Sequence, residues 1–267
     1  MKFLKVGGVI FGALLLTTLG INASDVFNGN SGSLLGQIIA TQEDVCPGGT
    51  MHISLSDKDI CIDIYENSVG EECDLEHPSS IFQTKQNIDN PLCYSESYPD
   101  VKPWTYVSQH QAKSLCVKKG ARLANTQEWY EGALGTPDDT LCNLNGTVRN
   151  AGSFESCVSY RGLYDTVGNV WEWVDGEVVD GQYNNRQVPE SGYVAEIDAQ
   201  GVPLETTSTS SELYNKDYFW GDMFGNNGVM RGGFYGSKDD GGVYATHMKV
   251  AQSFAGEATG FRCVYDL

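Results

Sequence analysis

Few combinations of residue type and spacing in this sequence point to acid–base or nucleophilic catalysis. It contains four histidines: His52, His77, His110 and His247. None forms an HExxH motif or a paired spacing, and neither a G-x-S-x-G nor a G-x-G-x-x-G motif occurs. Three catalytic hypotheses can be stated: His247 acts as a general base, Asp239 and Asp240 act as paired acids, or Ser237 acts as a nucleophile. A lone histidine is more often a contact residue, the two aspartates fit a solvated turn, and Ser237 has no identifiable base. We therefore predict no catalytic residue.

The N-terminus has the pattern of a secretory signal. Lys2 and Lys5 precede an uncharged apolar run from Val6 to Ile21, and small residues follow it. We expect residues 1–23 to be a signal peptide cleaved after Ala23, and an uncleaved N-terminal anchor is the alternative. The remainder is then secreted, periplasmic or on the cell surface, with no integral membrane span after cleavage.

Export makes the cysteines candidates for disulfides. The sequence has eight: Cys46, Cys61, Cys73, Cys93, Cys116, Cys142, Cys157 and Cys263. None lies in a C-x-x-C pair, which argues against zinc or iron–sulfur ligation. An even number in an oxidising compartment indicates disulfides, although counting alone does not choose the pairs. Proximity in the sequence suggests Cys46–Cys61, Cys73–Cys93 and Cys142–Cys157.

The charge of the chain limits its partners. It has 17 Lys and Arg residues against 35 Asp and Glu residues, a formal net charge of −18. So acidic a surface repels the phosphates of nucleic acids and anionic lipids. We therefore expect no nucleic-acid partner.

Local patterns predict strands and helices in the first half of the chain. Residues 51–55 and 60–65 alternate apolar and polar side chains, as half-buried strands do, around a polar turn at 56–59. A helix is predicted over 108–119, with Ser108 as its N-cap and Gly120 ending it. A second is predicted over 126–134, with Thr126 as its cap. We expect 24–44 to be a flexible leader and the acidic stretch 176–216 to be a long surface insertion, which gives a loop-rich α+β domain over 45–267.

Four stretches of the sequence, taken in order, carry a family resemblance. They are CPGGTMHI…CIDIYENS (46–68), ARLANTQEWYEGALG (121–135), GLYDTVGNVWEW (162–173) and VMRGGFYGS…TGFRCV (229–264). Together they resemble the formylglycine-generating enzymes, also called sulfatase-modifying factors. The resemblance implies a disulfide-bonded variant of the C-type lectin fold.

The copper site of that family is missing here. Its enzymes oxidise a cysteine of a client sulfatase, using copper held by two cysteines that follow the RGG motif. In this sequence Ser237 stands at the first of these positions and Gly242 at the second, and no cysteine occurs from Val229 to Gly260. Since Cu(I) selects soft thiolates, we expect no copper and a catalytically silent domain. The alternative is a family enzyme with a non-standard, metal-dependent oxidation site.

The resemblance also implies a disulfide and a calcium site. The family bridges the positions of Cys116 and Cys263. It also holds calcium with the side chains at Asp165 and Glu172 and the carbonyl groups at Gly168 and Val170, and Ca²⁺ favours such hard oxygen ligands. The alternative for this loop is a tight turn with core tryptophans on either side.

We expect the C-terminal segment around the lost copper site to bind a protein or glycan ligand. Aromatic and polar side chains are mixed there, as in many ligand contacts. The predicted ligand-binding residues are Trp171, Tyr235, Ser237, Lys238, Asp239, Tyr244, His247 and Lys249. For Tyr244, a place in the core is the alternative. A structural role in a cell-surface assembly is a further hypothesis.

The same segment has a second likeness. The stretch from Gly242 to Cys263 is similar to the variable region of receptors that are diversified by retroelements and use this lectin-type fold. This implies a diversified receptor as one form of the ligand-binding hypothesis.

Overall fold

The structure is a computed structural model that describes residues 45–267. The predicted signal peptide, 1–23, and the predicted leader, 24–44, lie outside the described residues. Gly48–Leu267 forms one compact unit, in which helices and two main sheets are combined, as the predicted α+β class requires.

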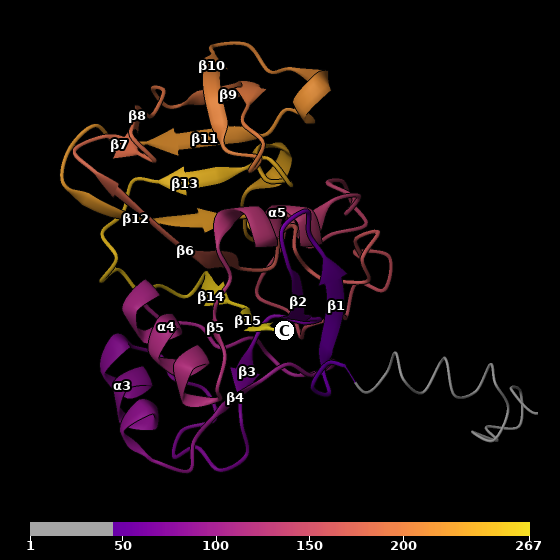
Figure 1. The fold of residues 1–267 in the computed structure, drawn as a ribbon, viewed down its shortest axis with the longest axis vertical. Helices are drawn as coiled ribbons and strands as arrows, with labels where there is room; N and C mark the ends of the chain where they lie inside the picture. The colour runs from indigo at the N-terminus through magenta and orange to yellow at the C-terminus, as the bar shows by residue number, and fades with distance from the viewer. Residues whose placement is uncertain (1–44) are drawn as a thin grey trace, which may run out of the picture. The chain divides into compact units, whose positions relative to one another are not determined.

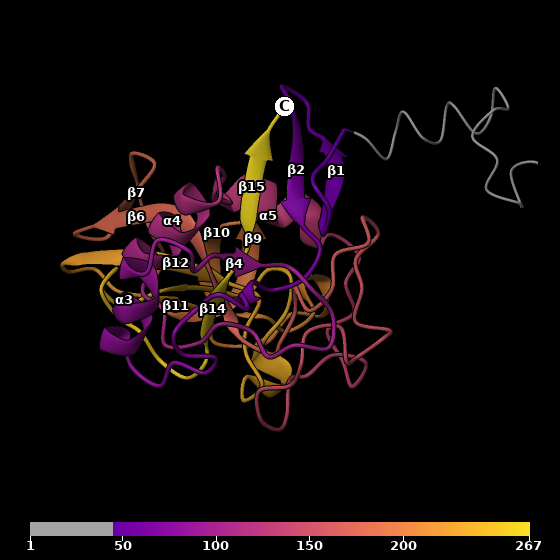
Figure 2. The ribbon, with the colours of Figure 1, turned by 90° about the horizontal axis from the view of Figure 1, so that it is seen from below.

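A small sheet contains the predicted hairpin. Strands β1 (Thr50–Ser54) and β2 (Asp59–Asp63) pair antiparallel, which confirms the alternation seen in the sequence. The sheet has four strands in the order β1-β2-β15-β5, so β15 (Cys263–Asp266) lies between β2 and β5 (Arg122–Leu123). Figure 2 shows the last strand beside the hairpin. The two ends of the described chain are thus joined in one sheet.

A nine-stranded sheet forms the other half of the unit (Figure 1). Its strands, in spatial order, are β10 (Pro203–Thr207), β9 (Gly192–Ile197), β11 (Tyr218–Gly221), β13 (Thr246–Met248), β12 (Asn226–Arg231), β6 (Trp171–Val179), β7 (Gln182–Tyr183) and β8 (Arg186–Gln187). Strand β14 (Thr259–Phe261) pairs in parallel with β6. A two-stranded ladder, β3 (Ser68–Val69) with β4 (Ser95–Glu96), lies apart from both sheets.

The stretch 176–216 differs from the prediction of a surface insertion. It supplies the end of β6 and strands β7 to β10 of the large sheet, followed by a 3-10 turn at Glu212–Tyr214. Five side chains of this stretch join the main core: Val178, Tyr183, Val188, Val194 and Val202. They lie in or directly beside the short strands, and single apolar residues so spaced are too sparse to give a clear periodicity.

Three helices are described. Helix α4 (Gln109–Lys118) confirms the prediction, with a capping box between Ser108 and Gln111. Helix α5 (Thr126–Ala133) also forms, but its cap is Asn125 rather than Thr126, because the Asn125 side chain accepts from the Glu128 backbone N–H. Helix α3 (Ile81–Asp89) was not predicted, because its sequence contains few apolar residues. A second 3-10 turn spans Lys238–Asp240.

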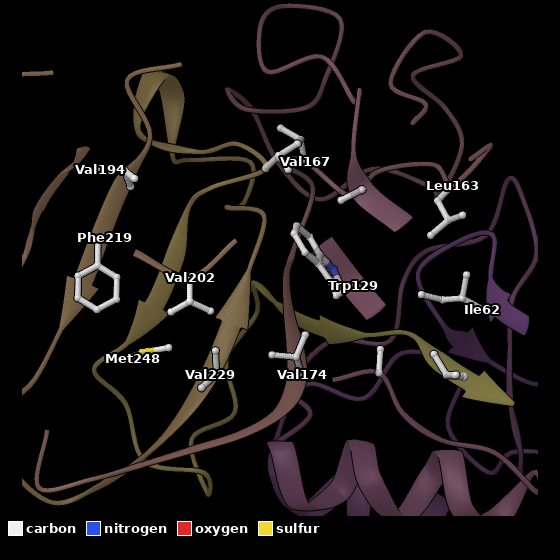
Figure 3. Close-up of a cluster of buried hydrophobic side chains, with 14 of the residues drawn as sticks. Ile62, Trp129, Leu163, Val167, Val174, Val194, Val202, Phe219, Val229 and Met248 are labelled. Atoms are coloured by element: carbon white, nitrogen blue, oxygen red, sulfur yellow. The ribbon is translucent and has the colours of Figure 1, made fainter. Parts of the chain in front are cut away.

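The main core lies between the large sheet and helix α5. Figure 3 shows Phe219, Met248 and Val229 from the sheet on one side of Trp129 and Leu163 and Ile62 on the other. The indole of Trp129 is fully buried. Because this helix packs against β6, its side chains fix the position of the strand that begins at Trp171.

Disulfides connect distant parts of the unit. The structure joins Cys73 to Cys93, Cys116 to Cys263 and Cys142 to Cys157, as predicted. Cys46 and Cys61 are disulfide-bonded as well. Every cysteine of the sequence is therefore oxidised. Among residues 45–267, no helix has both the length and the apolar character needed to cross a membrane.

Candidate functional site

The predicted calcium loop surrounds a buried ion pair. The Arg262 guanidinium donates from Nε to Glu172 Oε2 at 2.6 Å and from Nη2 to Oε1 at 2.5 Å. Trp129 Nε1 donates to the same Oε2 at 2.8 Å. The remaining Arg262 donors reach the carbonyl oxygens of three other residues: Asp63, Ile64 and Tyr164. Both side chains are fully satisfied without a ligand, and the pair connects β6, α5 and the small sheet.

This arrangement does not fit the predicted calcium set. Both oxygens of Glu172 are occupied by Arg262 and Trp129, so this carboxylate is not free to coordinate a cation. In the described part of the chain, no three His, Cys, Asp or Glu side chains are grouped as metal ligands. Calcium held by Asp165, Gly168, Val170 and Glu172 stays a prediction that this geometry does not support.

Two further carboxylates are buried in the same loop region. Glu66 is fully buried, and it accepts from Asn169 Nδ2 at 2.5 Å and from the Val170 backbone N–H at 3.1 Å. Asp165 accepts from the Gly152 backbone N–H at 2.6 Å. Burial raises the pKa of Asp165 to about 6, and burial with the nearby Asp165 charge raises the pKa of Glu66 well above its usual value. Sequence reasoning missed Glu66.

These raised pKa values predict that the domain loses stability as the pH rises. The pKa of Asp165 is higher in the fold than in the unfolded chain, so its contribution is complete below about pH 4 and is lost through about pH 6. We expect the free energy of unfolding to fall by roughly 1 to 2 kcal/mol between about pH 5 and about pH 8. Chemical denaturation across this range in a chelating buffer measures it.

Asp165→Asn is the matched variant for this prediction. Asp165 has a positive φ of 55°, a backbone conformation that asparagine tolerates. The variant keeps the shape but no longer titrates beside Glu66, Glu172 and Arg262, so the pH dependence should become shallower. An equally steep loss of stability in the variant would contradict the assignment to Asp165.

The predicted ligand-binding residues separate into different environments. Ser237 is buried, and its hydroxyl accepts from the Phe234 backbone N–H at 3.0 Å. Lys238 and Asp239 instead line a cavity of about 690 Å³ together with Asp138 and Lys216. Ser237 is therefore a structural residue of this loop, and its two neighbours face another part of the surface.

The side chains of Tyr244 and Lys249 do not join the other predicted ligand-binding residues in one site. The Tyr244 ring packs against Tyr130 and Tyr214, with centroids at 6.2 and 5.3 Å, so the alternative of a place beside the core describes it better. Lys249 is exposed, and its backbone N–H donates to His247 Nδ1.

Asp217 occupies the space beside the second lost copper position. A Cβ atom added at Gly242 would clash with both Asp217 carboxylate oxygens, each within 2.5 Å. Asp217 is fully buried; its Oδ2 accepts from the Tyr244 backbone N–H, while its Oδ1 has no partner. Burial raises its pKa well above the usual range. A cysteine at Gly242 would displace this carboxylate, so more than one change separates this segment from a thiolate site.

The remaining predicted residues join an aromatic cluster. The Trp171 ring lies 5.6 Å from the His247 ring and 6.4 Å from the Phe234 ring, and Phe234 lies 5.2 Å from Tyr235. Trp220 completes the cluster, 5.3 Å from Trp171 and stacked on His247 at 5.9 Å. All except Trp171 are half-buried, so ring surface remains accessible. We call these five residues the aromatic face.

Trp220 was missed by sequence reasoning. It lies on β11, next to β13, and the strand register places Trp220 opposite His247. The pairing joins residues far apart in the sequence, and the local composition around Trp220 gives no sign of it. The run of three aromatic residues, Tyr218, Phe219 and Trp220, favours a strand, but it does not show what the strand pairs with.

Comparison with known families identifies one match. Residues 138–267 match the family described as sulfatase-modifying factor enzyme 1-like domain. The matched range includes the buried ion pair and the whole aromatic face. No curated protein matches the chain.

Several solved structures are similar at low identity. The Major Tropism Determinant M1 variant is 15% identical with a TM-score of 0.47, and the match covers 83% of this chain and 53% of that one. This chain thus spans about half the length of that protein. Variable protein 1 of Treponema denticola is 15% identical with a TM-score of 0.37, and the match covers 83% of this chain and 100% of that one. PvdO from Pseudomonas aeruginosa is 14% identical with a TM-score of 0.39, and the match covers 84% of this chain and 100% of that one. Likenesses this distant do not carry function to this chain.

Proposed function

Because this chain carries a domain of the sulfatase-modifying factor family at residues 138–267, we propose that it is an exported, catalytically silent member that binds a ligand through its aromatic face. The accessible ring surface of Trp220, Tyr235 and His247, which are half-buried around Trp171, is the observation that carries this proposal. Aromatic side chains bring large contact area with little loss of conformational entropy. Export rests on the N-terminal pattern, and four disulfides are typical of an oxidising compartment.

Catalytic silence is supported by the state of the cysteines. All eight are disulfide-bonded, so no thiolate pair is left to hold Cu(I). Asp217 fills the space next to Gly242, where the family's second copper cysteine would stand. Hard oxygen groups are poor substitutes for thiolates at a Cu(I) site.

Oxidation of a cysteine peptide tests silence directly. The purified chain is incubated with copper and a sulfatase-type cysteine peptide, and conversion is followed by mass spectrometry beside an active family enzyme. We expect no conversion above the copper-only background. Turnover, or an iron or copper content near one per chain, would instead support the alternative of a non-standard oxidation site.

Substitution on the aromatic face tests ligand binding. Arrays of glycans and of surface proteins are probed with the wild-type chain, with His247→Ala and with Phe82→Ala. Phe82 is 82% exposed on α3, outside the aromatic face, so it is the matched control. We expect His247→Ala to weaken binding about tenfold, or about 1.4 kcal/mol, and the control to bind as wild type does. Equal binding by all three proteins would refute the face as the site.

A further inference from the structure

The aromatic face continues along the large sheet into a longer row of rings. Tyr218 lies 4.9 Å from Trp220, and Tyr193 lies 5.2 Å from Tyr218. We call the five residues of the aromatic face together with these two tyrosines the aromatic track. Its successive rings contact one another without interruption from Tyr193 to Tyr235.

The strand register explains why these rings share one side of the sheet. Tyr218 and Trp220 are two residues apart on β11, so both point to the same side, while Phe219 between them is fully buried on the other. Tyr218 stands opposite Tyr193 on β9, and Trp220 stands opposite His247 on β13. Such cross-strand pairs hold the rings at fixed positions.

Polar tips along the track remain available for hydrogen bonds. Of the five tryptophans, the fully buried Trp104, Trp129 and Trp173 each donate from Nε1 to an acceptor in the protein. Trp171 and Trp220 donate to no acceptor among residues 45–267, and neither indole nitrogen is enclosed without a partner. His247 Nδ1 accepts from the Lys249 backbone N–H, which leaves the ring proton on Nε2. The track therefore offers apolar ring faces with free donors beside them.

The rings of the track carry no charge at neutral pH. Burial, and to a smaller extent the Lys249 ammonium, lowers the pKa of His247 to about 4. The chain as a whole has a net charge of −18, so it repels acidic polymers. A long acidic ligand is therefore disfavoured, and the rings themselves supply no ionic partner for a charged one.

We propose that the aromatic track binds a neutral polysaccharide, with successive sugar rings lying along the half-buried rings of Tyr193, Tyr218 and Trp220. A pyranose has an apolar C–H face that packs on an aromatic ring and hydroxyl groups that accept from indole and imidazole N–H donors. This inference rests on the proposed function, because it names the ligand class of the same face. It adds Tyr193 of β9 and Tyr218 of β11 to the site.

Native affinity electrophoresis tests the inference. The full chain migrates through gels that contain a soluble polysaccharide, and retardation of the protein reports binding. The neutral probes are a β-1,3-glucan, hydroxyethyl cellulose and a galactomannan, and polygalacturonate is the acidic probe. We expect retardation by at least one neutral probe, unchanged at higher salt, and none by polygalacturonate. Tyr218→Ala should weaken binding about fivefold and Trp220→Ala about tenfold or more, with Tyr160→Ala, 88% exposed outside the track, as control.

A variant that fails to fold would also fail to bind, so folding and binding must be measured separately. Trp220 packs partly against a buried cluster, so Trp220→Phe is measured as well, and quenching of tryptophan fluorescence by a matching oligosaccharide gives a second readout on the wild-type chain. Retardation that all variants keep, or retardation by polygalacturonate alone, would overturn the inference. If no polysaccharide binds but a protein from the array does so through His247, the carbohydrate inference fails while the proposed function stands.

Discussion

Glu172→Gln is expected to lower the free energy of unfolding by about 3 to 5 kcal/mol, because it leaves the Arg262 guanidinium buried without its counter-charge. Both side chains are at most 1% exposed, so water cannot replace the lost carboxylate. The glutamine still accepts one hydrogen bond, which isolates the loss of charge. Urea denaturation at constant pH measures the change.

A double variant separates the charge effect from a packing effect. Arg262→Met alone should be as damaging as Glu172→Gln, whereas the two together should cost less than the sum of the single changes. Asp89→Asn removes the exposed Lys85–Asp89 pair and should change stability by less than about 0.5 kcal/mol. If Glu172→Gln were as mild as this control, the ion pair would not be holding the sheets together.

Removal of the Cys116–Cys263 disulfide has the second large expected effect. The two cysteines are 147 residues apart in sequence, and closing a loop of that length restricts the unfolded chain by roughly 5 kcal/mol in the simplest entropy model. The double variant Cys116→Ala/Cys263→Ala should lose up to this amount. The midpoint of denaturation under non-reducing conditions measures it.

The Cys73–Cys93 bridge provides the comparison. Its cysteines are 20 residues apart, so the same model gives about 3 kcal/mol. Cys73→Ala/Cys93→Ala should therefore be the milder of the two double variants. A reversed order would show that local packing, rather than chain entropy, sets the contribution of these bridges.

The sequence was most informative where structure depends on neighbouring residues. The hairpin β1–β2 follows from alternation within a few residues, and α4 follows from Ser108, one apolar side and Gly120. Two disulfides join cysteines that are only 20 and 15 residues apart, so proximity was a sound guide. The Cys116–Cys263 bridge spans too much of the chain for that guide, and it came from the family resemblance alone.

The candidate site was less predictable because its partners are distant. Glu172 was expected to coordinate calcium from its place in the GLYDTVGNVWEW motif, but Arg262, 90 residues later, takes both its oxygens. The contact between Trp220 and Trp171 was also not predictable, because it depends on the order of the strands in the large sheet. Such pairings depend on strand order and register, which a single sequence does not specify.

The position of β15 has a consequence for how this domain is made. The hairpin β1–β2 is translated first, yet its central partner in the four-stranded sheet is the last strand described. Until that strand is available, the β2 edge is unpaired, so the chain cannot complete the four-stranded sheet. The small sheet should therefore be completed only after the chain up to Asp266 is available, and the exposed β2 edge needs protection from other chains until then.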